Sequence, residues 1–118
     1  MLYISGQVKF PTTVASCPEL PLRQLGDQEI NIVDIVRPVT KYAKMVTDPA
    51  MIRYELEKAI GIALSGRKGP VWLDIPINVQ SAEINPDDLP AYEEAPESVP
   101  EITADAVDAV MASLRKAA

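Results

Sequence analysis

The chain has 118 residues, 47% of them apolar, and a formal net charge of −6, which suits one small domain with a modest core. A single Cys and no His exclude an internal disulfide and argue against a transition-metal site, so no residue is expected to bind metal. No apolar run approaches a membrane span, and neither a secretory signal pattern nor a basic stripe is present. We therefore expect no membrane and no nucleic-acid partner, and a cytoplasmic location.

The first third of the chain predicts a strand, a loop and a short helix. The apolar stretch at residues 2–5 predicts a buried strand, and residues 6–24, with three Pro and several Thr and Ser, predict a long irregular loop. Such loops inside a domain are usually functional or partly disordered. Apolar residues at helical spacing then predict a short helix within Gln28–Val36, which Pro38 should end before Arg37.

The middle of the chain predicts a strand and a longer helix. Residues 41–46 favour a second strand, and residues 49–65 favour a helix with Asp48 as N-cap and Pro49 in its first turn. One apolar stripe, typical of a helix packed on a sheet, comprises Ile52, Leu56, Ala59, Ile60, Ala63 and Leu64. Strand, helix and the strand that follows should form a right-handed βαβ unit.

Residues 66–80 read Gly-Arg-Lys-Gly-Pro-Val-Trp-Leu-Asp-Ile-Pro-Ile-Asn-Val-Gln. Gly66 supplies the left-handed backbone that commonly ends a helix, and Pro70 bars the helix from continuing. The apolar run at residues 71–75 predicts a strand covered on both faces, which should end at Pro76 because proline cannot donate to a ladder.

The acidity of the chain is concentrated in its last third. Residues 81–118 carry nine acidic and two basic side chains, whereas residues 1–80 carry eight acidic and nine basic ones. Residues 81–101 are rich in Pro, Asp and Glu without periodicity, which is typical of a linker. Thr103 should then cap a second helix, whose apolar stripe of Val107, Val110, Met111 and Leu114 requires a partner surface.

Four segments in order resemble thiamine-diphosphate enzymes of the acetolactate synthase type. Residues 66–80 resemble the G-R-P-G-P-V-x-x-D-x-P-x-D-x-Q that closes the N-terminal, pyrimidine-binding domain of that family, with Lys68 and Asn78 as departures. The other segments are Ile-Ser-Gly-Gln-Val at 4–8, Leu-Gly-Asp-Gln-Glu at 25–29, similar to the family's F-Q-E, and Pro-Val-Thr-Lys at 38–41. The resemblance covers roughly residues 2–80.

The resemblance implies an α/β fold with part of a doubly wound parallel sheet. Residues 1–80 would be the C-terminal half of a pyrimidine-binding domain, 81–101 a linker, and 102–118 the first helix of a truncated central domain. The chain would then be a fragment of a longer enzyme that condenses 2-keto acids with decarboxylation, as in branched-chain amino-acid synthesis. Full-length relatives act as homo-oligomers, either dimers or tetramers.

The cofactors implied by the resemblance are thiamine diphosphate, whose ylid performs the chemistry, and Mg²⁺, which holds the diphosphate. The family's catalytic glutamate is expected upstream of Met1 and its G-D-G…N metal segment beyond Ala118, and Gly26-Asp27-Gln28 does not match that segment. Many synthases also hold FAD in the central domain. We therefore expect no catalytic residue in this chain, and no activity from the chain alone.

The candidate pocket residues are Gln28, Gln7, Lys41 and Asp27. Gln28 matches a Gln at the substrate end of the cofactor, where a neutral amide can donate to a keto-acid oxygen; alternatively, it caps the following helix. Gln7 follows a strand where open α/β sheets bind ligands, or else it orders the loop. Lys41 matches a Lys of the access channel, or is simply solvated. Asp27 stands where the synthases more often carry Phe, a position that shapes the pocket.

The sequence also indicates roles for Asp74 and Cys17, and it leaves two other functions open. Asp74, in an apolar strand, favours a structural hydrogen-bonding role over catalysis because a buried carboxylate needs a partner; Cys17 is expected to be an ordinary thiol. One alternative function is a non-catalytic association module. The other is a fragment of a different thiamine-diphosphate lyase or decarboxylase, since Asp27 departs from the synthase pattern.

Overall fold

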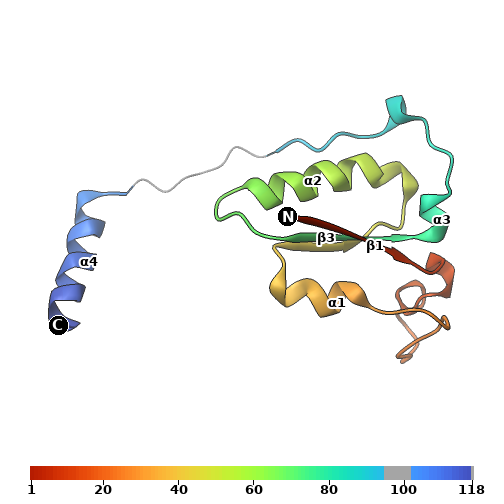
Figure 1. The fold of residues 1–118 in the computed structure, drawn as a ribbon, viewed down its shortest axis with the longest axis horizontal. Coiled ribbons are helices and arrows are strands. Elements are labelled where there is room, and N and C mark those ends of the chain that lie inside the picture. The colour runs from red at the N-terminus through yellow and green to blue at the C-terminus, as the bar shows by residue number, and fades with distance from the viewer. Residues whose placement is uncertain (95–101, 118) are drawn as a thin grey trace.

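The structure is a computed structural model that describes residues 1–94 and 102–117. Its centre is a three-stranded parallel sheet, in the order β1-β3-β2, of β1 (Leu2–Gln7), β2 (Tyr42–Met45) and β3 (Val71–Pro76) (Figure 1). The first residues of β1 and β2 both pair with Val71 at the start of β3. The predicted parallel α/β fold and all three predicted strands are confirmed.

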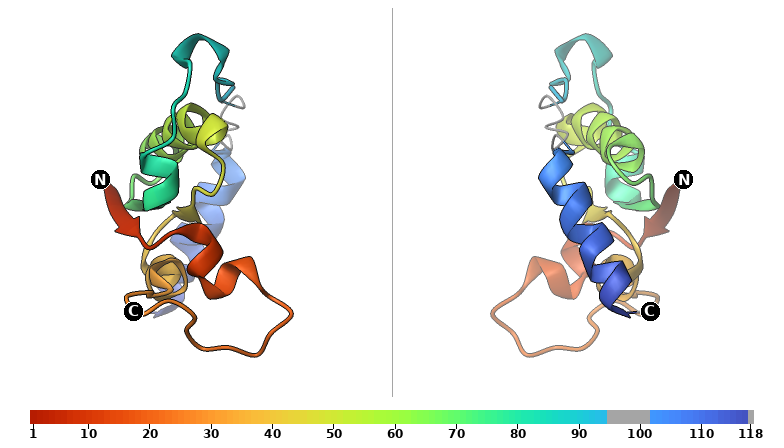
Figure 2. Two further views of the ribbon diagram at one scale, coloured as in Figure 1. Left: turned by 90° about the vertical axis from the view of Figure 1, so that its right-hand side faces the viewer. Right: turned by 90° about the vertical axis from the view of Figure 1, so that its left-hand side faces the viewer.

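Two helices, α2 and α1, lie on opposite faces of this sheet. The α-helices are α1 (Ile32–Val36), α2 (Ile52–Leu64), α3 (Ile77–Gln80) and α4 (Ala104–Ala117), and 3-10 turns occupy Phe10–Thr12, Val14–Ser16, Arg37–Val39, Pro49–Met51 and Pro86–Asp88. The end-on views place α2 on one face of the sheet and α1 on the other (Figure 2). This two-sided cover matches part of a doubly wound fold. Within the described ranges, no helix is long and apolar enough to cross a membrane.

The core lies between β3 and α2. Its fully or nearly fully buried side chains are Val46, Ala59, Ala63, Val71, Leu73 and Val79. Two small residues of α2, Ala59 and Ala63, belong to the same buried cluster as Leu73 of β3, and their size favours a close approach of the helix to the sheet. Four of the six residues of β3 are buried, as expected for the central strand of a sheet covered on both faces.

The expectation that β1 is a buried strand is wrong for this chain. Tyr3 and Ile4 are 42% and 57% exposed. The reason is position: β1 is an edge strand that pairs with β3 alone, so its outer edge and much of its surface remain uncovered. Tyr3 instead stacks on Trp72 of the neighbouring strand, with ring centroids 5.1 Å apart.

The predicted helix at 49–65 is confirmed with a different beginning. Asp48 accepts a hydrogen bond from the Ala50 N–H at 2.9 Å, but Pro49–Met51 form a 3-10 turn and the α-helix begins at Ile52. Gly66 ends it with φ 46°, as predicted. Two members of the predicted stripe, Ile60 and Leu64, are exposed.

Glu55 of α2 is buried, although it lies outside the apolar stripe from which this helix was predicted. It accepts a hydrogen bond from the Tyr42 hydroxyl at 2.5 Å and so ties α2 to β2. Burial raises the pKa of the Tyr42 hydroxyl, and the hydrogen bond to Glu55 raises it further. Tyr42 therefore stays protonated and keeps donating across the physiological range.

The segment after α3 returns along the outside of α2 (Figure 1). The N–H of Tyr92 donates to Glu57 at 2.7 Å, and the Tyr92 ring meets Tyr54 edge-on at 5.4 Å. Residues 95–101 of the predicted linker lie outside the described residues, so the division into 1–80, 81–101 and 102–118 stays a prediction. Thr103 caps α4 as predicted, accepting from the Ala106 N–H at 3.3 Å, and no side chain of α4 is buried.

Candidate functional site

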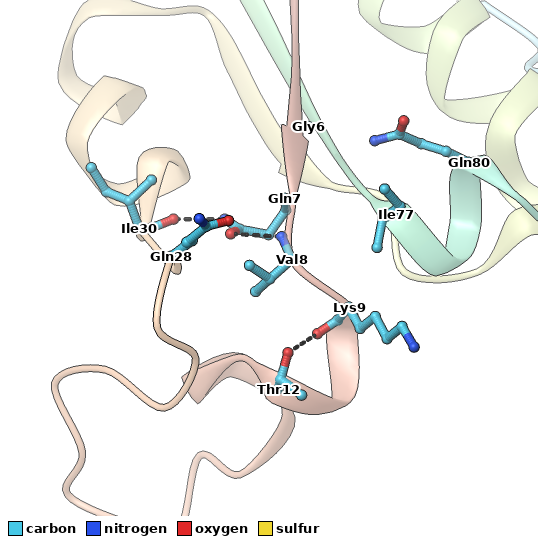
Figure 3. Close-up of a pocket in the computed structure, with 9 residues that line it drawn as sticks. All are labelled: Gly6, Gln7, Val8, Lys9, Thr12, Gln28, Ile30, Ile77 and Gln80. Carbon is cyan, nitrogen blue, oxygen red and sulfur yellow. Dashed lines mark hydrogen bonds between the residues drawn. The ribbon is translucent and has the colours of Figure 1, made fainter.

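An open pocket of about 600 Å³ lies at the carboxyl ends of β1 and β3. Strand ends, the loop between β1 and α1, and α3 all contribute to it (Figure 3). The residues that line it are Gly6, Gln7, Val8, Lys9, Thr12, Gln28, Ile30, Ile77 and Gln80. This edge is where open α/β sheets bind ligands, and two of the four predicted site residues, Gln7 and Gln28, meet there.

Gln7 is buried at the pocket wall, and its side-chain amide makes three hydrogen bonds. Its Nε2 donates to the carbonyl of Ile30 at 2.7 Å and to Asp74 Oδ2 at 3.1 Å, while its Oε1 accepts from the Val8 N–H at 3.1 Å. These bonds tie the loop to the sheet, in keeping with the loop-ordering alternative for this residue. A ligand that competed for this amide would have to replace them.

Asp74 supports Gln7 from inside the sheet. It is 0% exposed, and its Oδ1 accepts a hydrogen bond from the Ser5 hydroxyl at 2.6 Å. Ser5 in turn accepts from Trp72 Nε1 at 2.8 Å. The buried carboxylate thus has two donors, Ser5 and Gln7, which suits the structural role predicted for it.

Gln28 reaches the pocket from the loop and is exposed. It lies beside Gln7 and Ile30 (Figure 3). The alternative in which Gln28 caps the following helix is wrong, because α1 begins only at Ile32 and Asn31 caps it by accepting from the Asp34 N–H at 3.2 Å. Gln28 is therefore the exposed amide most directly available to a ligand in this pocket.

The other two predicted site residues lie elsewhere. Lys41 precedes β2 at the amino end of the sheet, and its Nζ donates to the carbonyls of Ile62 at 2.5 Å and Ser65 at 2.6 Å. It thereby satisfies the last carbonyls of α2, as basic side chains commonly do at a helix C-terminus. Asp27 is exposed, and its carbonyl accepts from Gln24 Nε2 at 3.2 Å. Neither is brought beside the pocket by this chain.

Glu29 has a structural role that the sequence pattern did not indicate. One carboxylate oxygen accepts from the Val14 N–H at 2.6 Å, and the other from the N–H groups of Leu25 at 2.8 Å and Gly26 at 3.3 Å. Burial raises the pKa of Glu29, but the three N–H donors outweigh it, so the pKa lies below its usual value of 4.5. The only sequence signal was its place at the end of the 25–29 motif.

Lys9 and Gln80 also line the pocket without having been predicted. Lys9 is the single charged side chain among the lining residues. Gln80 donates through Nε2 to the Ile75 carbonyl at 2.6 Å, and a Cβ at Gly6 would lie 3.2 Å from that nitrogen. Gly6 therefore leaves the room that the Gln80 amide occupies at the wall.

The donor set suits an anionic or carbonyl group better than a metal ion. Among the nine lining residues, all in the described part of the chain, three carry amides, one an ammonium group and none a carboxylate. Across residues 1–94 and 102–117, no cluster of three or more His, Cys, Asp or Glu side chains could hold a metal. An aminopyrimidine or a metal diphosphate would need groups beyond this set, whereas a keto-acid oxygen would find donors here.

The sequence is similar to several curated proteins. It is 46% identical over 70 residues to the acetolactate synthase large subunit of Corynebacterium glutamicum, covering 55% of this chain and 11% of that protein. It is 39% identical over 83 residues to a glyoxylate carboligase of Escherichia coli O157:H7, covering 66% of this chain and 14% of that protein. It is 37% identical over 85 residues to the acetolactate synthase of Arthrospira platensis, covering 72% of this chain and 13% of that protein.

No family model matches the chain. The chain spans only 11% to 14% of the length of these three relatives. The resemblance to the acetolactate synthase type of thiamine-diphosphate enzyme is nevertheless confirmed over more than half of the chain, since two synthases and the related carboligase match it at such identity.

Proposed function

We propose that this chain forms part of the pyrimidine-binding domain in a thiamine-diphosphate enzyme of the acetolactate synthase type. The observation that carries the proposal is the 46% identity over 70 residues to an acetolactate synthase large subunit. The parallel sheet with helices on both faces supports it, as does the pocket at the carboxyl ends of its strands. The reaction would be a decarboxylating condensation of two 2-keto acids.

The chain's share of the active site would be the substrate end of the pocket. Gln28 is exposed there and would donate a hydrogen bond from its amide to a keto-acid oxygen. Lys9 would add a positive charge that favours the substrate carboxylate. Gln7 would act indirectly, since its amide is bonded to Asp74 and Ile30.

The remaining catalytic parts would come from outside these 118 residues. Thiamine diphosphate, when bound, supplies the carbanion equivalent that joins the two substrates. Glu29 is unavailable to assist it from this chain, because its carboxylate already accepts three backbone N–H bonds. Mg²⁺, FAD and the partner subunits of a homo-oligomer would likewise be held by other segments. The chain alone would therefore be inactive.

A second candidate is condensation of glyoxylate. The match to a glyoxylate carboligase covers 66% of this chain, and Asp27, which precedes the pocket residue Gln28, stands where synthases more often carry Phe. In a full-length enzyme whose pocket extends to position 27, a polar residue would suit a substrate without a methyl group better than an apolar residue does. This candidate keeps the fold and the cofactor and changes only the acid that the enzyme accepts.

A chimera tests both candidates. The matched residues of this chain would replace their counterparts in the Corynebacterium glutamicum large subunit, and product formation would be measured with pyruvate and with glyoxylate. Activity with pyruvate that a Gln28→Ala change lowers about 10-fold or more supports the first candidate. A preference for glyoxylate supports the second. A well-folded chimera that binds thiamine diphosphate but turns over neither acid contradicts both, and the unchanged large subunit is the control.

A further inference from the structure

We propose that Glu29 is a positioning residue that holds Gln28 at the pocket by clasping the two halves of the loop between β1 and α1. The inference rests on the proposed function, because it assigns Glu29 a part in presenting Gln28 to a substrate. It starts from one geometric fact: a single carboxylate accepts N–H bonds from Val14 in the first half of the loop and from Leu25 and Gly26 in the second.

The two halves of the loop are otherwise held together by close backbone approach. A Cβ at Gly26 would lie 2.7 Å from the carbonyl oxygen of Thr12, closer than side chains tolerate, so only glycine permits the contact. Thr12 itself lines the pocket. The carboxylate of Glu29 therefore joins the two halves of the loop close to Thr12, where the first half of the loop reaches the pocket wall.

Hydrogen bonds hold the backbone on both sides of Gln28. On one side, the Gly26 carbonyl accepts from the Glu29 N–H at 3.4 Å, which closes a short turn around Asp27 and Gln28. On the other side, the carbonyl of Ile30 accepts from Gln7 Nε2 at 2.7 Å. Gln28 contributes no anchor of its own to the sheet, so these neighbours fix where its amide points.

The charge of Glu29 is what lets one side chain serve three donors. A carboxylate offers acceptor sites on both oxygens, whereas an amide replaces one of them by a donor that would face either the Val14 N–H or the N–H groups of Leu25 and Gly26. Charged acceptors also make stronger hydrogen bonds to backbone N–H groups. Glu29→Gln should therefore open the clasp while keeping the size of the side chain.

The full 118-residue chain provides the first test. Amide hydrogen exchange at Val14, Leu25 and Gly26, and the ¹⁵N relaxation of the Gln28 side-chain amide, would be compared between the unchanged chain and E29Q. We expect exchange to accelerate about 10-fold or more and the Gln28 amide to become more mobile. The matched control is E19Q, which changes an exposed Glu of the same loop and should alter neither. Unchanged exchange at the three amides in E29Q would overturn the clasp.

The chimera separates positioning from a merely structural role. E29Q should raise the KM for pyruvate about 10-fold and leave kcat within about 2-fold, because it weakens substrate binding without removing a reacting group. Faster exchange together with an unchanged KM would overturn the positioning role. If the unsubstituted chimera folds but is inactive, the proposed function fails instead, and the mobility of the Gln28 amide in the chain decides: unchanged mobility in E29Q would still overturn the inference.

Discussion

The sheet with α2 and the loop between β1 and α1 are held by different forces. Around Leu73 and Val71, apolar side chains are removed almost completely from water, and burial of that kind supplies most of the stability of a small domain. The loop has little such burial, and single polar side chains hold it instead, chiefly Gln7 and Glu29. Stability should therefore depend on the first region and the shape of the pocket on the second.

The largest expected effect comes from the sheet. Leu73→Ala should lower the free energy of unfolding by about 2–5 kcal/mol, because it leaves a cavity between β3 and α2 where Leu73 is 0% exposed. Urea denaturation followed by circular dichroism measures it. The matched control is Ile4→Ala on the exposed edge strand, which should change stability by only about 0.5 kcal/mol. Similar losses for both variants would contradict the view that β3, rather than β1, carries the core.

The next largest expected effect changes both the stability of the sheet and the hydrogen bonds that hold the loop. Asp74→Asn should lower the free energy of unfolding by about 1–3 kcal/mol, because one of its acceptors becomes a donor that faces Ser5 or Gln7. Since Gln7 links Asp74 to Ile30, amide exchange in the loop should also accelerate. Asp34→Asn, at an exposed ion pair with Arg37, is the control and should change neither. A destabilised Asp74→Asn variant with an unchanged loop would show that the two regions are independent.

A smaller effect is confined to the loop and depends on pH. The pKa of Glu29 lies below its usual value of 4.5 because backbone N–H donors outweigh the effect of burial. Its contribution is therefore fully present above pH 4.5 and is lost as the pH falls through the lowered pKa of the folded state. Exchange of the Val14 and Leu25 amides, corrected for intrinsic rates, should accelerate across that acidic window. The same titration of E29Q should show no such step, and a step of equal size there would assign it to another group.

The sequence predicted the first region well because burial leaves a periodic pattern. An apolar stripe at helical spacing located α2, and an apolar run bounded by Pro70 and Pro76 located β3. Gly66 was predictable for a local reason, since a left-handed backbone at a helix end favours glycine. The same periodicity placed Ile60 and Leu64 in the core wrongly, because the stripe was drawn wider than the face that meets the sheet.

The sequence predicted the site only in part because polar contacts leave no period. Gln7 and Gln28 were placed by a strand end and a motif, and both line the pocket. Lys41 has a long flexible side chain whose direction the sequence does not determine, and it turns to the end of α2. The role of Glu29 depends on three N–H groups that only the folded loop brings together. No spacing in the sequence therefore indicated that role.

The smallest effect concerns the segment that returns along α2, which combines both kinds of contact. Tyr92→Ala removes the edge-on ring contact with Tyr54, and such pairs contribute about 0.5–1.5 kcal/mol. The backbone N–H at position 92 keeps its bond to Glu57, whose pKa is lowered by the hydrogen bond from Arg53 and then by this N–H. Exchange of that amide should therefore accelerate by only about 2- to 10-fold, while the urea midpoint of the sheet stays the same. Glu93→Ala, at an exposed neighbour, is the control; a shifted midpoint in Tyr92→Ala alone would make this segment part of the cooperative core.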